Sequence, residues 1–184
     1  MPQVVELVRR QGHGDVWTHI NSGNVVFEAT GTRAALEQSL ETTFEEELGF
    51  EVTTFVRTTA ELRRTLTLQP FVVGPGDTYF VTFLKDSPSK SEARALEALS
   101  NDFDTLVVQG RDVHWHMRSK STDTKLGTKA WDDIVVTTAA PVATRPCSAN
   151  CWTRSTPGNP GRSVSALDWY SQGARGFYEG ASTV

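Results

Sequence analysis

Over the first 135 residues, apolar side chains recur at two different spacings. Recurrence every three to four residues places them on one face of a helix and predicts four helices, over residues 2–11, 33–48, 60–68 and 89–100. Alternation of apolar and polar residues is typical of half-buried strands. It predicts six strands, over residues 16–20, 25–29, 51–58, 78–85, 104–110 and 112–117.

Turn-forming and capping residues bound these segments. Residues 21–24, Asn-Ser-Gly-Asn, join the first two strands and predict a hairpin, because Gly23 adopts positive φ without steric cost. Thr32 is expected to cap the second helix, and Gly49 is expected to end it. Thr59 is expected to cap the third helix.

The order of these elements repeats once along the chain, which predicts two halves. Residues 70–77 contain two prolines and two glycines and form the expected boundary. On either side, the order of helices and strands matches part of the split βαββαβ unit. We therefore predict an α+β fold of two tandem ferredoxin-like halves: residues 1–72, which lack the opening strand, and residues 73–135, which lack the closing helix and strand.

The composition changes after Val135. Residues 136–184 are rich in Thr, Ala, Pro, Ser, Gly and Arg, contain no lysine, and have one leucine, Leu167. Such a composition is typical of a disordered tail. Both cysteines, Cys147 and Cys151, lie here, at a spacing that matches no common metal or redox motif.

Charge and hydropathy narrow the classes of function. The chain has 18 basic and 22 acidic residues; without the four Arg and two acidic residues after Val135, the first 135 residues have 14 and 20, a net charge of −6. This charge disfavours nucleic acid as a partner, because binding to phosphate groups depends on Lys and Arg. No apolar run approaches the roughly 20 residues of a membrane span. We expect a soluble cytoplasmic protein without a cofactor.

Two histidines are the candidates for a metal site. His114 and His116 are two residues apart in a predicted strand, so both side chains are expected on one face of the sheet. The spacing places no third ligand beside them. A cross-strand pair or a solvent-facing pair explains the same pattern, and no metal is predicted.

The predicted ligand-binding residues come from one turn and one loop: Asn21, Ser22, Gly23, Asn24, Lys125 and Lys129. The backbone N–H groups of the turn could bind an anion, although a turn that sets the register of two strands explains the same residues. The two lysines make their loop locally basic, which suits a phosphorylated ligand; a solvated loop is the other interpretation.

The hairpin Thr18–Phe27, THINSGNVVF, carries a family resemblance. With the preceding GHGDVW, the ELGFEV junction and the segment KLGTKAWDD, it resembles the bacterial domain-of-unknown-function family sixteen ninety-seven over about residues 1–135. The resemblance implies two ferredoxin-like halves and no established activity. Members of that family open with a strand in the middle of the sheet. We therefore expect an N-terminal truncation of this chain, with the neighbours of that strand lacking ladder partners.

The resemblance also offers a second interpretation of the tail. Family members continue with a Ser-Thr-Arg motif and an amphipathic helix. In the frame shifted by one base, the codons of Asn150 to Thr153 can encode only Leu, Leu and Asp, and the triplets permitted from Val135 to Arg154 include the family motif. We expect a frameshift near Val135, with residues 136–184 out of frame. A natural disordered tail is the alternative, and a stop codon in the shifted frame would exclude the frameshift.

These features together predict an uncharacterised bacterial protein that binds an unidentified small molecule or protein partner and has no catalytic residues. The alternative is an enzyme that acts on a phosphorylated or nucleotide-like small molecule. That enzyme would use Ser22 and Asn24 at the turn and Lys125 or Lys129 in the loop.

Overall fold

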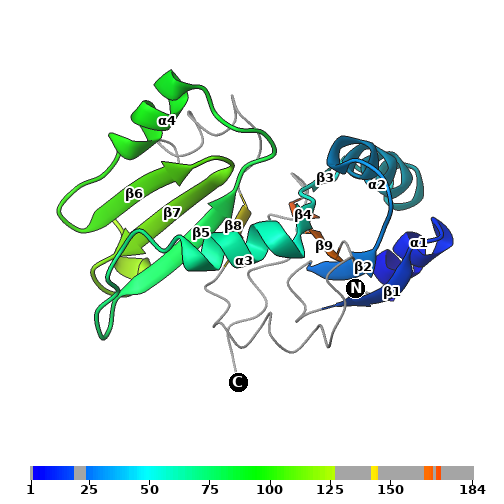
Figure 1. Ribbon diagram of the computed structural model, residues 1–184, viewed down its shortest axis with the longest axis horizontal. Coiled ribbons are helices and arrows are strands. Elements are labelled where there is room, and N and C mark those ends of the chain that lie inside the picture. Colours follow the sequence, from blue (N-terminus) through cyan, green and yellow to red (C-terminus); the bar gives the residue numbers. More distant parts are fainter. Residues whose placement is uncertain (1, 19–23, 127–141, 145–163, 168, 171–184) are drawn as a thin grey trace. The chain divides into compact units, whose positions relative to one another are not determined.

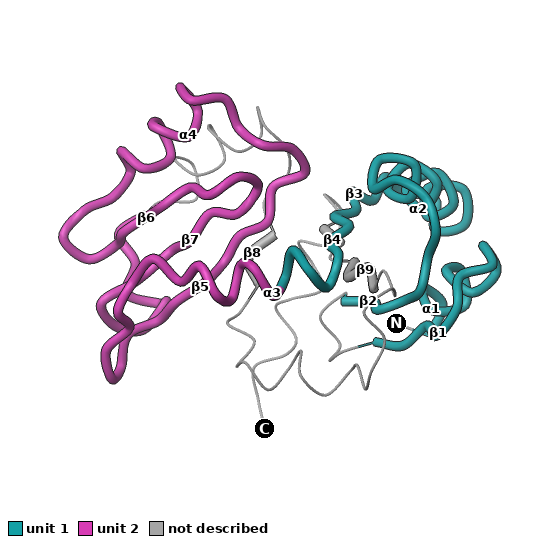
Figure 2. The backbone as a smooth tube through the Cα atoms, viewed as in Figure 1, with its two compact units in different colours: residues 1–62, 159–184 teal, residues 63–158 magenta. Residues whose placement is uncertain are grey.

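The chain divides into two compact units, which Figure 2 shows in different colours. The structure, a computed structural model, describes residues 2–18, 24–126, 142–144, 164–167 and 169–170. Unit 1 comprises Met1–Leu62 and Asn159–Val184, and unit 2 comprises Arg63–Gly158. The predicted division into residues 1–72, 73–135 and 136–184 stays a prediction.

Both units combine helices with antiparallel strands, which makes the protein a mixed α+β protein (Figure 1). The elements of unit 1 are α1 (Pro2–Arg10), β1 (Gly14–Thr18), β2 (Val25–Glu28), α2 (Arg33–Leu48), β3 (Thr53–Thr54), β4 (Arg57–Thr58), β9 (Val164–Leu167) and β10 (Trp169–Tyr170). Helix α3 (Thr59–Thr67) leads from unit 1 into unit 2. The other elements of unit 2 are β5 (Thr78–Phe83), α4 (Lys90–Glu97), β6 (Asp104–Gln109), β7 (Asp112–Met117), the 3-10 helix η1 (Ser121–Asp123) and β8 (Val142–Thr144).

The main sheet of unit 1 has the strand order β1-β2-β9-β4, and every neighbouring pair is antiparallel. The predicted hairpin of β1 and β2 is confirmed, with Thr18 opposite Val25. Strand β9 lies between β2 and β4 and pairs with both. The expectation that two strands here lack ladder partners is therefore wrong, because a segment of the predicted tail lies between them.

The core of unit 1 forms where α1 and α2 pack on this sheet. Both helices bury the apolar side chains that recur at helical spacing. Thr32 caps α2 by accepting a hydrogen bond from the N–H of Ala35 at 3.3 Å, and Gly49 ends it at φ 78°, as predicted. The buried apolar residues of this core are Val4, Leu7, Val8, Val16, Val25, Phe27, Leu36, Leu40, Phe44, Val52 and Val56.

The predicted strand over residues 51–58 is instead split into β3 and β4. Two carboxylates of α2 take backbone N–H groups in this region: Glu41 accepts from Thr54 at 2.8 Å and Glu37 accepts from Val56 at 2.9 Å. These carboxylates take N–H groups that a single long strand would offer to a ladder, and the two short strands pair with different partners, β3 with β10 and β4 with β9.

The start of α3 also differs from the sequence prediction. Thr58, one residue before the predicted Thr59, accepts a hydrogen bond from the N–H of Glu61 at 3.2 Å, and the Glu61 carboxylate accepts from the N–H of Thr58 at 2.8 Å. This reciprocal pair is a capping box, and it begins the helix one residue earlier than expected.

The sheet of unit 2 has the antiparallel order β6-β7-β5-β8. The predicted tight turn between β6 and β7 is confirmed at Gly110, which has a φ of 63°. Helix α4 begins with a capping box of Ser89 and Glu92 and packs Leu96 against Leu106 and Val113 on one face of the sheet. The described part of the predicted second half, residues 73–126, contains β5, β6 and β7, and the fourth strand of this sheet, β8, comes from the predicted tail and pairs with β5.

Candidate functional site

The two histidines lie on the face of the unit 2 sheet opposite α4. In the pairing of β5 with β7, Tyr79 is opposite His116 and Val81 is opposite His114. Side chains of directly opposite residues point to the same face, so the predicted same-face placement of the two histidines is confirmed. We call this surface the histidine face; its residues in the argument below are Tyr79, Val81, Gln109, His114 and His116.

His114 is fully buried on this face, and its ring contacts the side chain of Tyr79 on the neighbouring strand. The Tyr79 hydroxyl and His114 Nδ1 form a hydrogen bond, and the two rings are stacked with centroids 6.0 Å apart. Burial, with a smaller effect from Asp112, raises the pKa of Tyr79 to about 12. Burial also lowers the pKa of His114, so at neutral pH the hydroxyl keeps its proton and the imidazole is uncharged.

The second ring nitrogen of His114 and the amide oxygen of Gln109 are buried polar atoms. Among the described residues, neither His114 Nε2 nor Gln109 Oε1 has a hydrogen-bond partner. Gln109 is opposite Asp112 on β7, which makes it a diagonal neighbour of His114 on the same face. We assign donation from Tyr79 to His114 Nδ1, which leaves the ring proton on Nε2. The histidine face therefore has a buried hydrogen-bond donor on β7, His114 Nε2, and a buried acceptor on the adjacent strand β6, Gln109 Oε1.

His116 completes the face toward the start of β5. Its Nε2 lies 2.9 Å from Asp77 Oδ2, and its ring stacks on Phe71 with centroids 5.4 Å apart. Asp77 is held by a turn, because its carboxylate also accepts from the N–H of Gly74 at 2.8 Å and Gly76 adopts a φ of 90°. The hydrogen bonds from His116 and Gly74 hold the pKa of Asp77 below its usual value.

We expect the stability of unit 2 to fall as the solution becomes acidic, because His114 is buried without charge. Burial, opposed in part by Asp112, places the folded-state pKa of His114 below its ordinary value of 6.5. The unfolded state therefore binds more protons below pH 6.5, and stability decreases from there down to the lowered pKa. Each tenfold difference in the proton affinity of His114 between the folded and unfolded states changes the free energy of unfolding by about 1.4 kcal/mol.

This pH dependence is measured by urea unfolding at pH 7.5 and pH 5. The His114→Phe variant keeps an aromatic ring and has no titrating group at this position. In this variant the free energy of unfolding should differ less between pH 7.5 and pH 5 than it does in the parent. An equal difference in the variant and the parent would assign the pH dependence to other groups.

The arrangement around the histidines does not favour a metal centre. Among the residues that the structure describes, no group of three His, Cys, Asp or Glu side chains could hold a metal ion. His114 Nδ1 and His116 Nε2 are both engaged by protein side chains, Tyr79 and Asp77. The polar atoms of the histidine face are therefore better suited to hydrogen bonding than to binding a metal ion.

Lys125 lies in a loop that a buried carboxylate holds in place. Asp104 is fully buried and accepts hydrogen bonds from Asn101 Nδ2 at 3.2 Å, Trp115 Nε1 at 3.0 Å, Thr124 Oγ1 at 2.7 Å and the N–H of Lys125 at 3.0 Å. Burial alone would raise the pKa of Asp104, but these hydrogen bonds outweigh it and keep the pKa below the usual value.

The structure separates the predicted site residues. Asp104 is opposite Met117 in the register, which places its side chain on the α4 face and not on the histidine face. The exposed Lys125 is therefore anchored to the opposite side of the sheet from His114 and His116. Of the other predicted residues, Asn24 directly precedes β2 in unit 1. Asn21, Ser22, Gly23 and Lys129 lie outside the described residues.

Four residues that build this region were not identified from the sequence. Tyr79 and Gln109 come to the histidine face through strand pairing, which places residues far apart in the chain side by side. Asp77 is part of a Pro-Gly turn, and Asp104 begins a strand. The Gly74-Pro75-Gly76-Asp77 segment signals a turn in the sequence, because Pro and Gly favour turns, but the hydrogen bond from Gly74 to Asp77 is seen only in the structure.

The fold and the histidine face define a small α+β protein with a buried pair of hydrogen-bonding groups on one sheet. A family model described as "Protein of unknown function (DUF1697)" matches residues 1–114, and the chain belongs to this family. A search of curated proteins and a search of solved structures each found no match. In the described part of the chain, no helix is long and apolar enough to cross a membrane.

Proposed function

We propose that the protein is a binding module and that the histidine face of unit 2 recognises a planar small molecule. The observation that carries this proposal is the buried His114 Nε2, which has no hydrogen-bond partner among the described residues. A buried polar group without a partner costs about 1–3 kcal/mol, so native proteins contain few of them and each one calls for an explanation.

The two buried atoms define the edge that a ligand would present. His114 Nε2 offers a proton, and Gln109 Oε1 accepts one. A ligand with a neighbouring carbonyl oxygen and N–H group satisfies both atoms at once. Lactams, carboxamides and nucleobases have such an edge, and this chemistry agrees with the nucleotide-like ligand of the sequence-based alternative.

The rings on the same face favour a flat ligand. Tyr79 stacks on His114, and Phe71 stacks on His116 with an interplanar angle of 26°. Phe71, Tyr79 and His116 are half-buried, so their rings offer both apolar surface and polar edges. Aromatic and apolar walls with a few placed polar groups are the usual construction of a small-molecule site.

We further propose that each unit is a ferredoxin-like half. The order β1-β2-β9-β4 in unit 1 and the order β6-β7-β5-β8 in unit 2 support this proposal, since both place the two strands of a hairpin on one side of the sheet. In this arrangement β9 fills one strand position in the sheet of unit 1, and β8 fills one in the sheet of unit 2.

The enzyme hypothesis of the sequence analysis remains the second candidate. The exposed Lys125, in its loop fixed by Asp104, is the residue that would contact a phosphate group. Asn24 belongs to unit 1 and Lys125 to unit 2, so the described geometry adds no support for a joint site.

Thermal unfolding in the presence of uracil tests the binding proposal. Uracil is planar and carries an N–H group between two carbonyls, whereas 1,3-dimethyluracil has the same ring without an N–H donor. Uracil is expected to stabilise the protein, by about 2.7 kcal/mol at one hundred times its dissociation constant, and dimethyluracil is expected to have a much smaller effect.

Two variants assign the effect to the histidine face. Gln109→Met removes the buried acceptor at nearly constant length; it is expected to abolish stabilisation by uracil while leaving the stability of the free protein equal or higher, by about 1–3 kcal/mol at most. Gln69→Met, an exposed position in unit 2, is the matched control and should respond to uracil as the parent does. Equal stabilisation of all three proteins, or none by uracil, would contradict the proposal.

A further inference from the structure

The two polar atoms that define the histidine face are closed off from solvent. His114 is fully buried, and both His114 Nε2 and Gln109 Oε1 are buried atoms. A ligand that forms hydrogen bonds with these atoms has to pass the segments that lie over them. Binding at the histidine face therefore requires that a covering segment moves.

The first segment over this face is the part of α3 that belongs to unit 2. Its Thr65 is 6% exposed and donates a hydrogen bond to Asp112 Oδ2 at 2.5 Å. Asp112 is directly opposite Gln109 in the register, so both side chains are on the histidine face. Helix α3 therefore covers the end of the face at which Gln109 lies.

The second segment is the loop that joins α3 to β5, residues 68–77, which we call the strap. Its Phe71 ring contacts two rings of the histidine face, with centroid distances of 5.4 Å to His116 and 6.0 Å to Tyr79. Tyr79 is hydrogen-bonded to His114, and His116 is two residues from His114 on β7. The strap therefore covers the aromatic neighbours of His114.

The strap is held over the face at two points. One is the stack of Phe71 on His116. The other is a single oxygen, Asp77 Oδ2, which lies 2.9 Å from His116 Nε2 and also accepts from the N–H of Gly74 at 2.8 Å. Gly74 allows this close approach, because a Cβ at its position would lie 3.1 Å from the same oxygen. Asp77 thus joins the turn of the strap to β7.

Most of the strap faces solvent. Val72 is 96% exposed and Val73 is 36% exposed. In the described part of the chain, residues 69–73 form no hydrogen bond, whereas α3 has the regular hydrogen bonds of a helix and buries Thr65. Segments with few buried contacts and few hydrogen bonds open at the lowest cost in free energy. Of the two covering segments, the strap is therefore the one that opens more readily.

We propose that the strap is a gate that opens to admit a planar ligand to His114 and Gln109 and closes again through Phe71 and Asp77. This inference rests on the proposed binding function and adds the route by which the ligand enters. The closed strap keeps water away from the bound ligand, which strengthens its hydrogen bonds to His114 Nε2 and Gln109 Oε1. The opening of the strap then limits the rates of both entry and release.

The first test measures the gate without a ligand. Diethylpyrocarbonate modifies accessible, uncharged imidazole rings, and mass spectrometry reports each histidine separately. Phe71→Ala and Asp77→Ala each remove one attachment of the strap, and each is expected to increase the modification rate of His114 roughly tenfold or more. Val72→Ala, at the exposed neighbouring position, is the matched control and should leave this rate unchanged.

Two further measurements distinguish an open strap from a damaged fold. The backbone amides of the β6–β7 ladder should exchange with solvent as slowly in the variants as in the parent, and His13 of unit 1 should be modified at the parental rate. Modification of His114 that appears only when the ladder is lost would overturn the gate. An equal modification rate of His114 in the parent and in both strap variants would overturn it as well.

The change Asp77→Asn tests the second attachment by itself. Its amide retains one oxygen, which can accept from Gly74 and His116 as Asp77 Oδ2 does. His114 should therefore be modified more slowly in Asp77→Asn than in Asp77→Ala. Equal rates in these two variants would exclude the hydrogen bonds of Asp77 as an attachment of the gate.

Uracil separates the gate from the binding proposal. The rates of association and dissociation, obtained from NMR line shapes, should both be roughly tenfold higher or more in Phe71→Ala and Asp77→Ala than in the parent. Parental rates in these variants would overturn the gate and leave the binding proposal intact. Protection of His114 by the strap, without binding of uracil to any of these proteins, would contradict the binding proposal and still support the strap as the cover of His114.

Discussion

Replacing Asp104 by Ala is expected to lower the free energy of unfolding of unit 2 by about 3–5 kcal/mol. The carboxylate is fully buried and accepts hydrogen bonds from Asn101, Trp115, Thr124 and the N–H of Lys125. Without it these donors lose their acceptor, and the loop that carries Lys125 is released. Urea unfolding measures the loss, and faster cleavage by trypsin after Lys125 reports the release of the loop.

The change Asp104→Asn is a graded version of the same test. Its amide retains one oxygen, which can serve either Trp115 and Thr124 or the other two donors, so a smaller loss is expected. Asp102→Ala, at an exposed neighbouring position, is the control and should change stability by less than about 0.5 kcal/mol. A loss in Asp104→Ala no larger than in the control would mean that the buried carboxylate does not stabilise unit 2.

A loss of about 2–4 kcal/mol is expected for Glu37→Ala in unit 1. Glu37 is 2% exposed, its Oε1 accepts from the N–H of Val56 at 2.9 Å, and its Oε2 lies 2.9 Å from Arg33 Nη1. Removal of the carboxylate leaves the buried N–H of Val56 without an acceptor. Hydrogen exchange at that amide, measured with urea unfolding, separates this local effect from global loss of stability.

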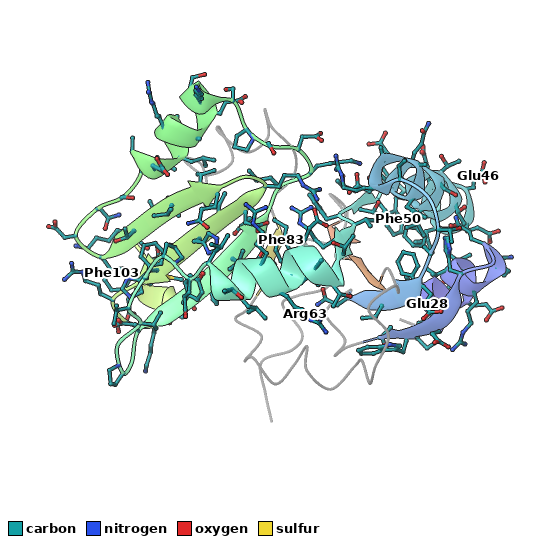
Figure 3. The ribbon with its side chains drawn as sticks, in the orientation of Figure 1. Glu28, Glu46, Phe50, Arg63, Phe83 and Phe103 are labelled. Carbon is teal, nitrogen blue, oxygen red and sulfur yellow. The ribbon has the colours of Figure 1, made fainter. Side chains whose placement is uncertain are left out.

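Glu46→Ala is the matched control for this change. Glu46 is on the same helix, and Figure 3 shows its side chain directed away from the rest of unit 1. Its removal should change stability by less than about 0.5 kcal/mol. In Glu37→Gln an amide oxygen can still accept from Val56, so slow exchange at that amide is expected to persist. Fast exchange in Glu37→Gln would show that the charge, and not the hydrogen bond, protects it.

Local signals in the sequence predicted most of the helices and strands. Thr32 and Gly49 bound α2 because a side-chain oxygen and a left-handed glycine satisfy the ends of a helix within a few residues. Gly110 made the turn between β6 and β7 predictable in the same way. Such interactions connect neighbouring residues, so they are visible in the sequence.

The candidate site was harder to predict because its residues meet through strand register. The histidine pair was recognised from its alternation, but Tyr79 and Gln109 are brought beside it by β5 and β6. The split of the strand over residues 51–58 has a similar cause. It depends on Glu37 and Glu41 of a separate helix, whose carboxylates reach backbone N–H groups that a sequence pattern assigns to a ladder.

The position of β9 has a consequence for protein synthesis. Strands β1, β2 and β4 leave the ribosome early, whereas β9 follows β4 by roughly 100 residues, a delay of about 5–20 s at ordinary rates of translation. Unit 2 is completed during that interval. The nascent chain is therefore expected to expose an unfinished sheet for seconds, a period in which a chaperone or a neighbouring nascent chain can reach it before its own strand does.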